Sequence, residues 1–509
     1  MKFNLMKIPN QTKLPGLILI CIFIMTGCKQ NEIPQIPTEV IKSPTAAQPG
    51  LTPAGESQAS TVPTTEPTPR PTTIPLERIQ YNLWAEIDYP NRWVLVEEKL
   101  LIPHPSSNPL TELVLVVPPQ AWPQVFSIQE LVWGDNTLVE NYVLDGIRLT
   151  IPLEQNWETG ENLSLTIRYS LDIPLQNARQ GYGPSPFGYT TRQTNLVDWY
   201  PMVPPYQDDI GWIIHDPWIF GESLVYPAAD FEVSLKLNNP GLVVAASSAA
   251  SKDGDLLNYS LKEARNFVFS ISPDYTVLEA EVNGIKVYGY IFPGYRISGE
   301  AAFNATLEAL DLYSDLFGLY AQSSLSMVQA DFNHGMEYEG LYFQSRGFFD
   351  TYAGSVESYL VAIAVHETAH QWWYGQVAND QALDPWLDEA LCTFSELIYY
   401  ELLYPNSSDW WWETRINYYE PYGRIDRSIY DYREYVDQYL AYRNATYLQG
   451  AKFLAGLKDV LGDELMYDFL REYAANNKNE IAESEDFFSL LNTYLDVNSL
   501  SWINEYFPE

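Results

Sequence analysis

The stretch VAIAVHETAHQWWYG, from Val361 to Gly375, places two of the chain's five histidines and one glutamate within five residues. Histidines four positions apart share one face of a helix, so the imidazoles of His366 and His370 can meet a single ion. Glu367 is rotated by about 100° from His366, which suits a base acting on metal-bound water better than a third ligand. The apolar residues before the motif predict a buried helix, where such a cluster needs a partner that a metal supplies. Because H-E-x-x-H also arises by chance, a metal centre requires a third ligand.

Glu389 is the candidate for that third ligand. Asp384 and Pro385 predict the start of the next helix, with Asp384 as its N-cap and Pro385 in its first turn. Glu389 lies one turn into this helix, and 18 residues separate it from His370. If a short loop folds this helix back across the first, Glu389 completes the three protein ligands of a hydrolytic zinc site. The alternative for Glu389 is an ordinary surface acid.

Two further residues of the same helix have predicted roles. Glu396 lies seven residues beyond Glu389 on the same face. It can hold a zinc-ligating histidine by a hydrogen bond, or it can be a solvated acid, and the sequence leaves both open. Cys392 follows an apolar helical pattern and is expected to be a small core residue, not a nucleophile.

The pattern along the chain predicts two different kinds of domain. Segments such as RWVLVEEKLLIP and FEVSLKLNNPGLVVAAS are short, apolar and bounded by Gly, Asn and Pro, which indicates an antiparallel β domain over residues 78–275. The stretch VLEAEVNGIKVYGYIF predicts a hairpin on an Asn283–Gly284 turn near the boundary. Beyond about Gly299 helical periodicity dominates, so residues 276–509 are expected to form a mainly helical domain. The fold class is therefore multidomain α+β.

The N-terminus predicts export. Three lysines precede the apolar run LPGLILICIFIMTG, which is too short for a membrane-spanning helix and fits a signal peptide over residues 1–27. The run ends in MTGC, which resembles a bacterial lipoprotein signal whose cysteine, here Cys28, becomes lipidated; an ordinary secretory signal is the alternative. Residues 28–77 are rich in Pro, Thr and Ser and predict a disordered tether. We therefore expect an extracytoplasmic protein, lipid-anchored to a bacterial membrane.

The charge excludes one class of partner. The chain has 29 Lys and Arg residues against 66 Asp and Glu residues, a formal net charge of −37. Such a surface repels nucleic acid and gives no support to a polybasic membrane-binding patch. The oligomeric state stays open.

The segments HETAHQWWYGQV and PWLDEALCTFSE together resemble the gluzincin aminopeptidases, the group of membrane alanyl aminopeptidase and leukotriene hydrolase. Further along the chain, NHGMEYEGLYF is similar to the family's G-x-M-E-N exopeptidase motif, and TYLQGAKFL is similar to its Y-x-K-G segment. The resemblance covers most of residues 78–509. It implies a saddle-like N-terminal β domain followed by a thermolysin-like zinc peptidase domain.

The resemblance also implies roles for individual residues. His366, His370 and Glu389 would bind one zinc ion, and Glu367 would be the general base. Glu337 would bind the free α-amino group of a peptide substrate, with the backbone of Gly335 and Met336 lining the cleft. Tyr447 would stabilise the oxyanion. This sequence departs from the family pattern at three positions: His334 stands where the exopeptidase motif has its first Gly, Tyr338 replaces an Asn, and Gln449 replaces a Lys.

These observations leave three functions open. The first is a zinc-dependent aminopeptidase that removes N-terminal residues from peptides. The second is an endopeptidase or another hydrolase on the same zinc core. The third is a tethered binding protein with a structural metal, in which DWWWETRINYYEPYG would be an exposed aromatic surface. Glu367 argues against the third, because a structural site needs no base.

Overall fold

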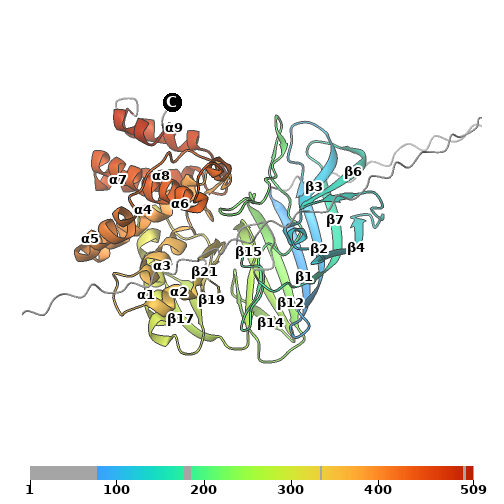
Figure 1. Cartoon of the computed structure of the whole chain (residues 1–509). Coiled ribbons are helices and arrows are strands. Elements are labelled where there is room, and N and C mark those ends of the chain that lie inside the picture. Colours follow the sequence, from blue (N-terminus) through green and yellow to red (C-terminus); the bar gives the residue numbers. More distant parts are fainter. Residues whose placement is uncertain (1–76, 177–184, 333–334, 497–499, 508–509) are drawn as a thin grey trace, which may run out of the picture. The chain divides into compact units, whose positions relative to one another are not determined.

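The computed structural model describes residues 77–176, 185–332, 335–496 and 500–507 (Figure 1). The predicted signal segment, Cys28 and all of the predicted tether except residue 77 lie outside the described residues, as do positions 333 and 334 of the motif NHGMEYEG. Within the described part of the chain, no helix combines the length and the apolar character that a membrane span requires.

The first half is a β domain built on a seven-stranded sheet with the order β14-β15-β12-β1-β2-β7-β4. Side chains alternate between buried and accessible along β1 and β2, so one face of the sheet packs on the core. Two smaller sheets, β3-β6-β5 and β13-β16-β9-β8, share this core, and β10 and β11 form a short ribbon. The strand bounds are β1 (Ile79–Asp88), β2 (Trp93–Pro103), β3 (Leu110–Val116), β4 (Phe126–Trp133), β5 (Val143–Asp145), β6 (Arg148–Trp157), β7 (Asn162–Asp172), β8 (Gly188–Tyr189), β9 (Thr194–Leu196), β10 (Tyr206–Gln207), β11 (Gly211–Trp212), β12 (Ala229–Leu237), β13 (Val243–Ala246), β14 (Ser251–Asp253), β15 (Leu256–Ala264) and β16 (Phe269–Ser272).

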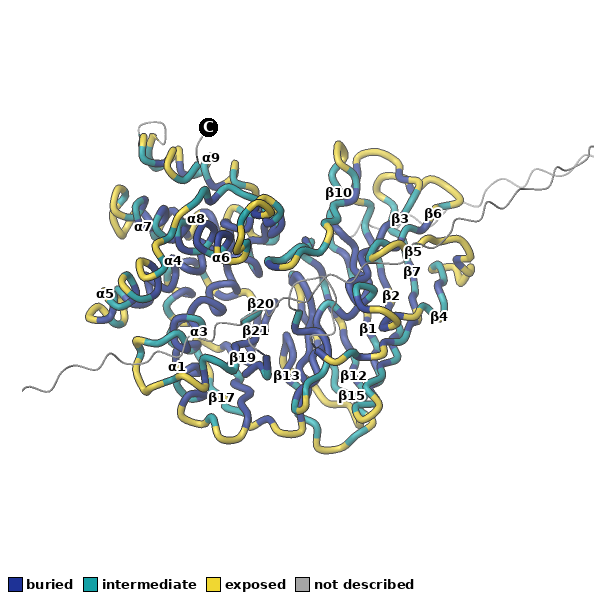
Figure 2. The backbone as a smooth tube through the Cα atoms, viewed as in Figure 1, coloured by how far each residue is buried: buried dark blue, intermediate teal, exposed yellow. Residues whose placement is uncertain are grey.

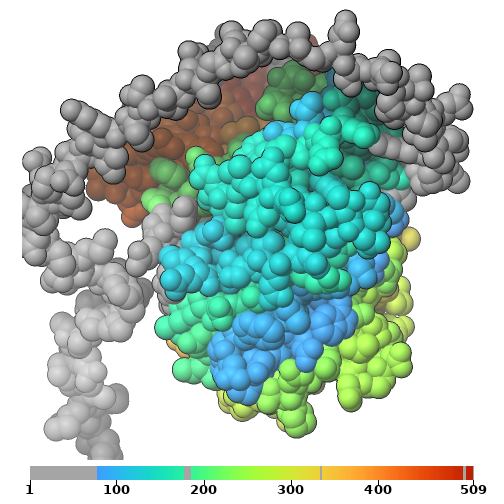
Figure 3. Space-filling model, turned by 90° about the vertical axis from the view of Figure 1, so that its right-hand side faces the viewer, coloured from blue at the N-terminus to red at the C-terminus, as the bar shows by residue number. Residues whose placement is uncertain are grey.

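The prediction of a wholly antiparallel β domain is wrong for one pair of strands. β1 and β12 run parallel over nine residue pairs, from Ile79 with Ala229 to Ile87 with Leu237. More than 130 residues separate these strands in the chain, so a crossing connection rather than a hairpin joins them. Figure 3 views this domain from outside, with the blue and teal surface of its first strands toward the viewer and the red-brown C-terminal helices behind.

The second half has a five-stranded sheet with the order β17-β18-β19-β21-β20. Its bounds are β17 (Thr276–Val282), β18 (Ile285–Ile291), β19 (Ser324–Ala330), β20 (Met336–Tyr338) and β21 (Leu341–Ser345). The predicted hairpin is confirmed: β17 and β18 are antiparallel, and Asn283 and Gly284 both have positive φ, 51° and 84°. Such a two-residue turn matches the twist of the flanking strands. β20 is an edge strand, so among the described residues only one side of its backbone pairs with another strand.

Helices make up most of the remainder of this domain and cover the sheet (Figure 1). Their bounds are α1 (Arg296–Phe317), α2 (Arg346–Thr351), α3 (Tyr359–Ala369), α4 (Trp386–Leu403), α5 (Ser408–Trp410), α6 (Gln438–Arg443), α7 (Gly450–Leu461), α8 (Asp463–Asn476) and α9 (Ser484–Tyr494). One-turn π-helical segments occupy Trp411–Ile416 and Asn444–Gln449. Two-residue strands, β22 (Ala378–Asn379) and β23 (Ile481–Ala482), pair in parallel and join the α3–α4 loop to the C-terminal region.

The helix that carries Glu389 begins one residue later than predicted. α4 starts at Trp386 and its N-cap is Pro385, not Asp384. The Asp384 carboxylate instead accepts a hydrogen bond from the Ser484 hydroxyl at 3.0 Å. A residue one hundred positions away in the chain therefore binds the side chain that was predicted to cap the helix.

One buried arginine makes several of the hydrogen bonds between the two halves. Arg265, from the end of the β domain, donates hydrogen bonds to five backbone carbonyls, at Tyr226, Gly375, Gln376, Asn479 and Glu480. Burial lowers its pKa to about 10, with the nearby Glu339 opposing that shift. Figure 2 shows the dark blue of buried residues continuing from the central strands of the β domain into β20, β21 and α3.

Candidate active site

The histidine motif occupies the end of α3. Ser358 caps this helix by accepting a hydrogen bond from the Val361 N–H at 3.4 Å, and the helix ends at Ala369 with His370 as its C-cap. Because His370 keeps a right-handed helical conformation, it stays on the same face as His366. Both histidines are almost fully buried.

Three donor atoms converge beside this face. His366 Nε2 lies 3.2 Å from His370 Nε2 and 3.1 Å from Glu389 Oε2, and His370 Nε2 lies 3.7 Å from the same carboxylate oxygen. Tetrahedral zinc with bonds of about 2.0–2.1 Å separates its ligand atoms by about 3.3 Å, so the three observed spacings match a zinc ligand triangle. α4 supplies Glu389 from its first turn, as the sequence predicts.

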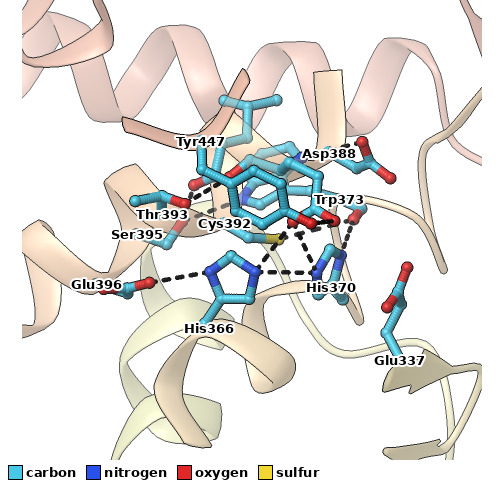
Figure 4. Close-up of polar contacts among 12 residues, drawn as sticks. Glu337, His366, His370, Trp373, Asp388, Cys392, Thr393, Ser395, Glu396 and Tyr447 are labelled. Carbon is cyan, nitrogen blue, oxygen red and sulfur yellow. Dashed lines mark hydrogen bonds and ion pairs between the residues drawn. The ribbon is translucent and has the colours of Figure 1, made fainter. Parts of the chain in front are cut away.

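The other nitrogen of each histidine is held by an acceptor. His366 Nδ1 faces Glu396 Oε1 at 3.0 Å, and His370 Nδ1 faces the Trp373 carbonyl at 3.1 Å (Figure 4). When both Nδ1 atoms donate, both Nε2 lone pairs point at one place beside a carboxylate oxygen. Burial and the neighbouring His366 lower the pKa of His370, which keeps it neutral as a ligand must be. Three donor atoms facing one buried point can hold a cation, and the donor set of two imidazoles and one carboxylate fits zinc.

Glu396 is the buried anchor of this arrangement. Besides His366 it accepts hydrogen bonds from Arg415 Nε and Nη2 and from Trp411 Nε1, each at 2.9 Å. Burial acts to raise the pKa of Glu396, but Arg415 and His366 outweigh it and hold the pKa below its usual value. The structure thus gives Glu396 the orienting geometry, not a solvated one. Trp411, part of the predicted aromatic surface, is fully buried.

Glu367 and Glu337, which lies on strand β20, are close to the ligand atom of His370. Glu337, Glu367 and His370 offer ligand atoms within 4.8 Å of one another. Burial raises the pKa of Glu367, and Glu337 and Glu389 add to the shift against the opposing effect of His366. The edge strand β20 carries Met336 and Glu337, and Glu337 Oε1 accepts a hydrogen bond from Gln381 Nε2 at 3.0 Å.

A glutamine that the sequence argument missed ties the metal helix to this strand. Gln371 directly follows the motif; its side chain donates to the Tyr338 carbonyl at 3.0 Å and accepts from the Gly340 N–H at 2.9 Å. Gln371 is buried, so these hydrogen bonds fix the position of β20, and of Glu337 on it, relative to the two histidines. In the sequence, only the position of Gln371 directly after the motif could have indicated a role for it.

Tyr447 lies over the ligand triangle. Its ring is nearly parallel to that of His366, and its hydroxyl donates a hydrogen bond to Glu389 Oε1. Glu389 therefore keeps Oε2 toward the histidines while Tyr447 holds Oε1. Tyr442, a neighbouring tyrosine, has its hydroxyl without a hydrogen-bond partner among the described residues. The geometry favours Tyr447 over Tyr442 for contact with the reacting atoms.

A pocket opens beside Glu337 and reaches into the β domain. Its lining includes Met336, Glu337 and Gln381 from the second half of the chain. The β domain contributes Glu222, Trp122, Trp218, Tyr226 and Asp198 to its wall. Burial, and after it the carboxylates of Glu389 and Asp388, raise the pKa of Glu222. Glu222 could not be predicted from the sequence, because it lies in a loop with no motif.

Comparison with known proteins agrees with this geometry. Residues 301–506 match the peptidase family M1 domain. Human endoplasmic reticulum aminopeptidase 2 is 28% identical over 226 residues, covering 41% of this chain and 23% of the human protein. The bovine protein of the same name is 25% identical over 395 residues, covering 72% of this chain and 40% of its own length. The chain therefore spans less than half the length of these relatives.

Solved structures share the fold. The M1 zinc metallopeptidase from Deinococcus radiodurans superposes with a TM-score of 0.57 at 16% identity, covering 84% of this chain and 93% of that one. The predicted α+β class, with a β-rich domain before a mainly helical domain, is confirmed. So is the resemblance to the gluzincin aminopeptidases.

Proposed function

We propose that this chain, whose residues 301–506 form a peptidase family M1 domain of the gluzincin type, is a zinc-dependent aminopeptidase that hydrolyses the N-terminal residue from peptides. The observation that carries the proposal is the position of two carboxylates, Glu337 and Glu222, in one pocket beside the metal donors. A peptide α-amino group has a pKa near 7.7–8.0 and is mostly a cation near neutral pH. Its burial is favourable only where anions receive it.

The residues of the chain divide the chemistry between them. His366, His370 and Glu389 would hold zinc, which lowers the pKa of bound water towards about 7 and polarises the scissile carbonyl. Glu367, buried and with a raised pKa, accepts the proton of the attacking water and delivers it to the leaving amine. The Tyr447 hydroxyl donates to the developing oxyanion. Glu337 and Glu222 bind the α-ammonium group and so place the first peptide bond at the base.

The test combines metal analysis with a substrate panel. We expect one zinc per chain in the purified protein, lost in Glu389→Ala and retained in Glu367→Gln, which abolishes turnover. Free-amine aminoacyl amides should be cleaved and their N-acetylated counterparts should not, and Glu337→Ala should severely reduce the rate. Equal rates on free and acetylated peptides would instead support an endopeptidase on the same zinc core. Full metal occupancy without Glu389 would contradict the ligand assignment.

For location, we propose an extracytoplasmic enzyme lipid-anchored to a bacterial membrane through Cys28. The support is the sequence alone: three lysines, an apolar run and the box MTGC. Cys28→Ser should move the protein from the membrane fraction to the soluble fraction after export. An unchanged membrane fraction would exclude Cys28 as the anchor.

A further inference from the structure

A segment of the β domain lies across the catalytic domain and carries Glu222. We call residues 215–222 the strap. At its start, His215 Nε2 lies 2.6 Å from Asp380 Oδ2, and the Tyr430 hydroxyl donates to the Asp216 carbonyl at 2.6 Å. The Arg433 guanidinium lies 4.5 Å above the Trp218 ring. Each of these contacts joins the two domains of the enzyme.

The end of the strap packs into a small apolar cluster separate from the two main cores. Phe220 stacks on Tyr442 with ring centroids 5.0 Å apart, and Ile429, Tyr432 and Ala382 complete the cluster around it. Gly221 follows with a φ of 69°, and a Cβ at this position would lie 2.8 Å from Ile429 Cγ2. Only glycine allows both this backbone conformation and this close approach. The next residue, Glu222, then enters the pocket that contains Glu337.

Asp380, the partner of His215, belongs to the loop between β22 and α4, which also reaches Glu337. Asp380 uses Oδ1 to accept the N–H groups of Ala382 and Leu383, both at 3.1 Å, while Oδ2 faces His215. Gln381 donates one hydrogen bond to Glu337 at 3.0 Å and another to Asp388 at 2.7 Å. The contact between His215 and Asp380 is thus connected to both acids: to Glu222 through the strap, and to Glu337 through the loop that contains Gln381.

We propose that His215 and Asp380 form a positioning pair for recognition of the substrate's amino group. The pair fixes Glu222 through the strap and Glu337 through Gln381, and it makes no contact with the reacting atoms itself. This inference rests on the proposed aminopeptidase function. Loss of the His215–Asp380 pair weakens the binding of a free α-ammonium group, while Glu367, Tyr447 and the metal donors keep their geometry.

The experiment measures steady-state kinetics on an aminoacyl amide for the full-length zinc enzyme and for His215→Ala and Asp380→Asn. We expect KM to rise about tenfold, since a charge-assisted contact of this kind is removed, while kcat changes by less than about threefold. Zinc content should stay at the wild-type level. Asp380→Asn is nearly isosteric, so it provides the measurement if His215→Ala fails to fold. His104→Ala is the matched control: this half-buried histidine bonds to the Ser106 and Trp157 carbonyls in the β domain, away from the cleft.

A double-mutant cycle separates positioning from general damage. If His215 acts through Glu222, then His215→Ala should have little further effect on KM in a Glu222→Gln background. Binding of a free amino acid, measured by calorimetry against its analogue without the amino group, should weaken in the variants only for the amine-bearing compound. Unchanged KM, a fall confined to kcat, or full additivity in the cycle would overturn the inference. A wild-type protein without zinc or aminopeptidase activity would instead refute the proposed function.

Discussion

Gly335 lies against the side chain of Glu367, so that a Cβ at residue 335 would overlap Glu367 Oε1 and lie 3.3 Å from Cδ. Gly335→Ala should therefore displace the base and lower kcat by at least about tenfold with zinc retained, because a misplaced proton acceptor loses much of its catalytic effect. Stopped-time assays with metal analysis check this. Gly347→Ala is the control, since its Cβ would meet only Ser345 Oγ at 3.6 Å. Equal kcat for the two variants would contradict the contact.

Tyr447→Phe should lower kcat by about 10²–10³ with little change in KM, because one donor to the oxyanion is removed while the ring and its packing stay. The Tyr447 hydroxyl also bonds to Glu389, so zinc content must be measured in parallel. Tyr442→Phe should stay close to wild type. A larger loss in Tyr442→Phe than in Tyr447→Phe would reverse the assignment.

Glu396→Gln should weaken zinc binding by about 10–100-fold, because His366 loses the carboxylate that orients it. The variant also leaves the buried Arg415 without its partner, at a cost of about 3–5 kcal/mol in unfolding free energy. A second substitution, Arg415→Met, should recover much of the stability and none of the zinc affinity. Thermal melts and competition with a chelator measure the two effects separately. Recovery of both would show that Glu396 acts only through stability.

We expect the unfolding free energy of the β domain to depend on pH because of Glu98. It is fully buried on β2, and neither carboxylate oxygen has a hydrogen-bond partner among the described residues. Burial raises its pKa well above the usual value, so the folded state binds a proton that the unfolded state releases near pH 4.3. Its stabilising contribution is complete below that pH and falls by about 1.4 kcal/mol per pH unit until the folded-state pKa is passed. Glu98→Met should remove this dependence. Denaturant melts between pH 5 and 8 should show that the difference in unfolding free energy between the variant and the wild type grows with pH.

The pocket beside Glu337 predicts a preference among N-terminal residues. Of the described residues that line it, three are acidic, Asp198, Glu222 and Glu337, and none is basic; Trp122 and Trp218 add aromatic walls. A long cationic side chain can stack on these rings and meet an anion, whereas an acidic one is repelled. Arginyl and lysyl amides should exceed glutamyl amides in kcat/KM by about tenfold or more, and Asp198→Asn should narrow the ratio. Comparable rates for both classes would exclude electrostatic selection.

The convergence of the three ligand residues could be predicted from the sequence because it depends on local spacing along the chain. A four-residue spacing on one helix and a carboxylate in the first turn of the next are enough to place His366, His370 and Glu389. The Asn283–Gly284 hairpin was predictable for the same reason. Glu222, by contrast, reaches the pocket only because the strap crosses to the catalytic domain. The residues next to Glu222 in the sequence give no indication of that contact. The parallel pairing of β1 with β12 and the capture of Asp384 by Ser484 are likewise decided between distant segments.

Arg265 has a consequence for the order in which the chain folds. Two of its five carbonyl acceptors, at Asn479 and Glu480, lie about one hundred positions beyond two others, at Gly375 and Gln376, which follow the histidine motif. Contacts between segments so far apart in the chain require a long loop to close first, so they form later than the turns of α3. Until they form, the buried guanidinium lacks some of its acceptors, and the loop after His370 is not held against the β domain. We therefore expect this loop to reach its final position only when the two halves of the chain have docked.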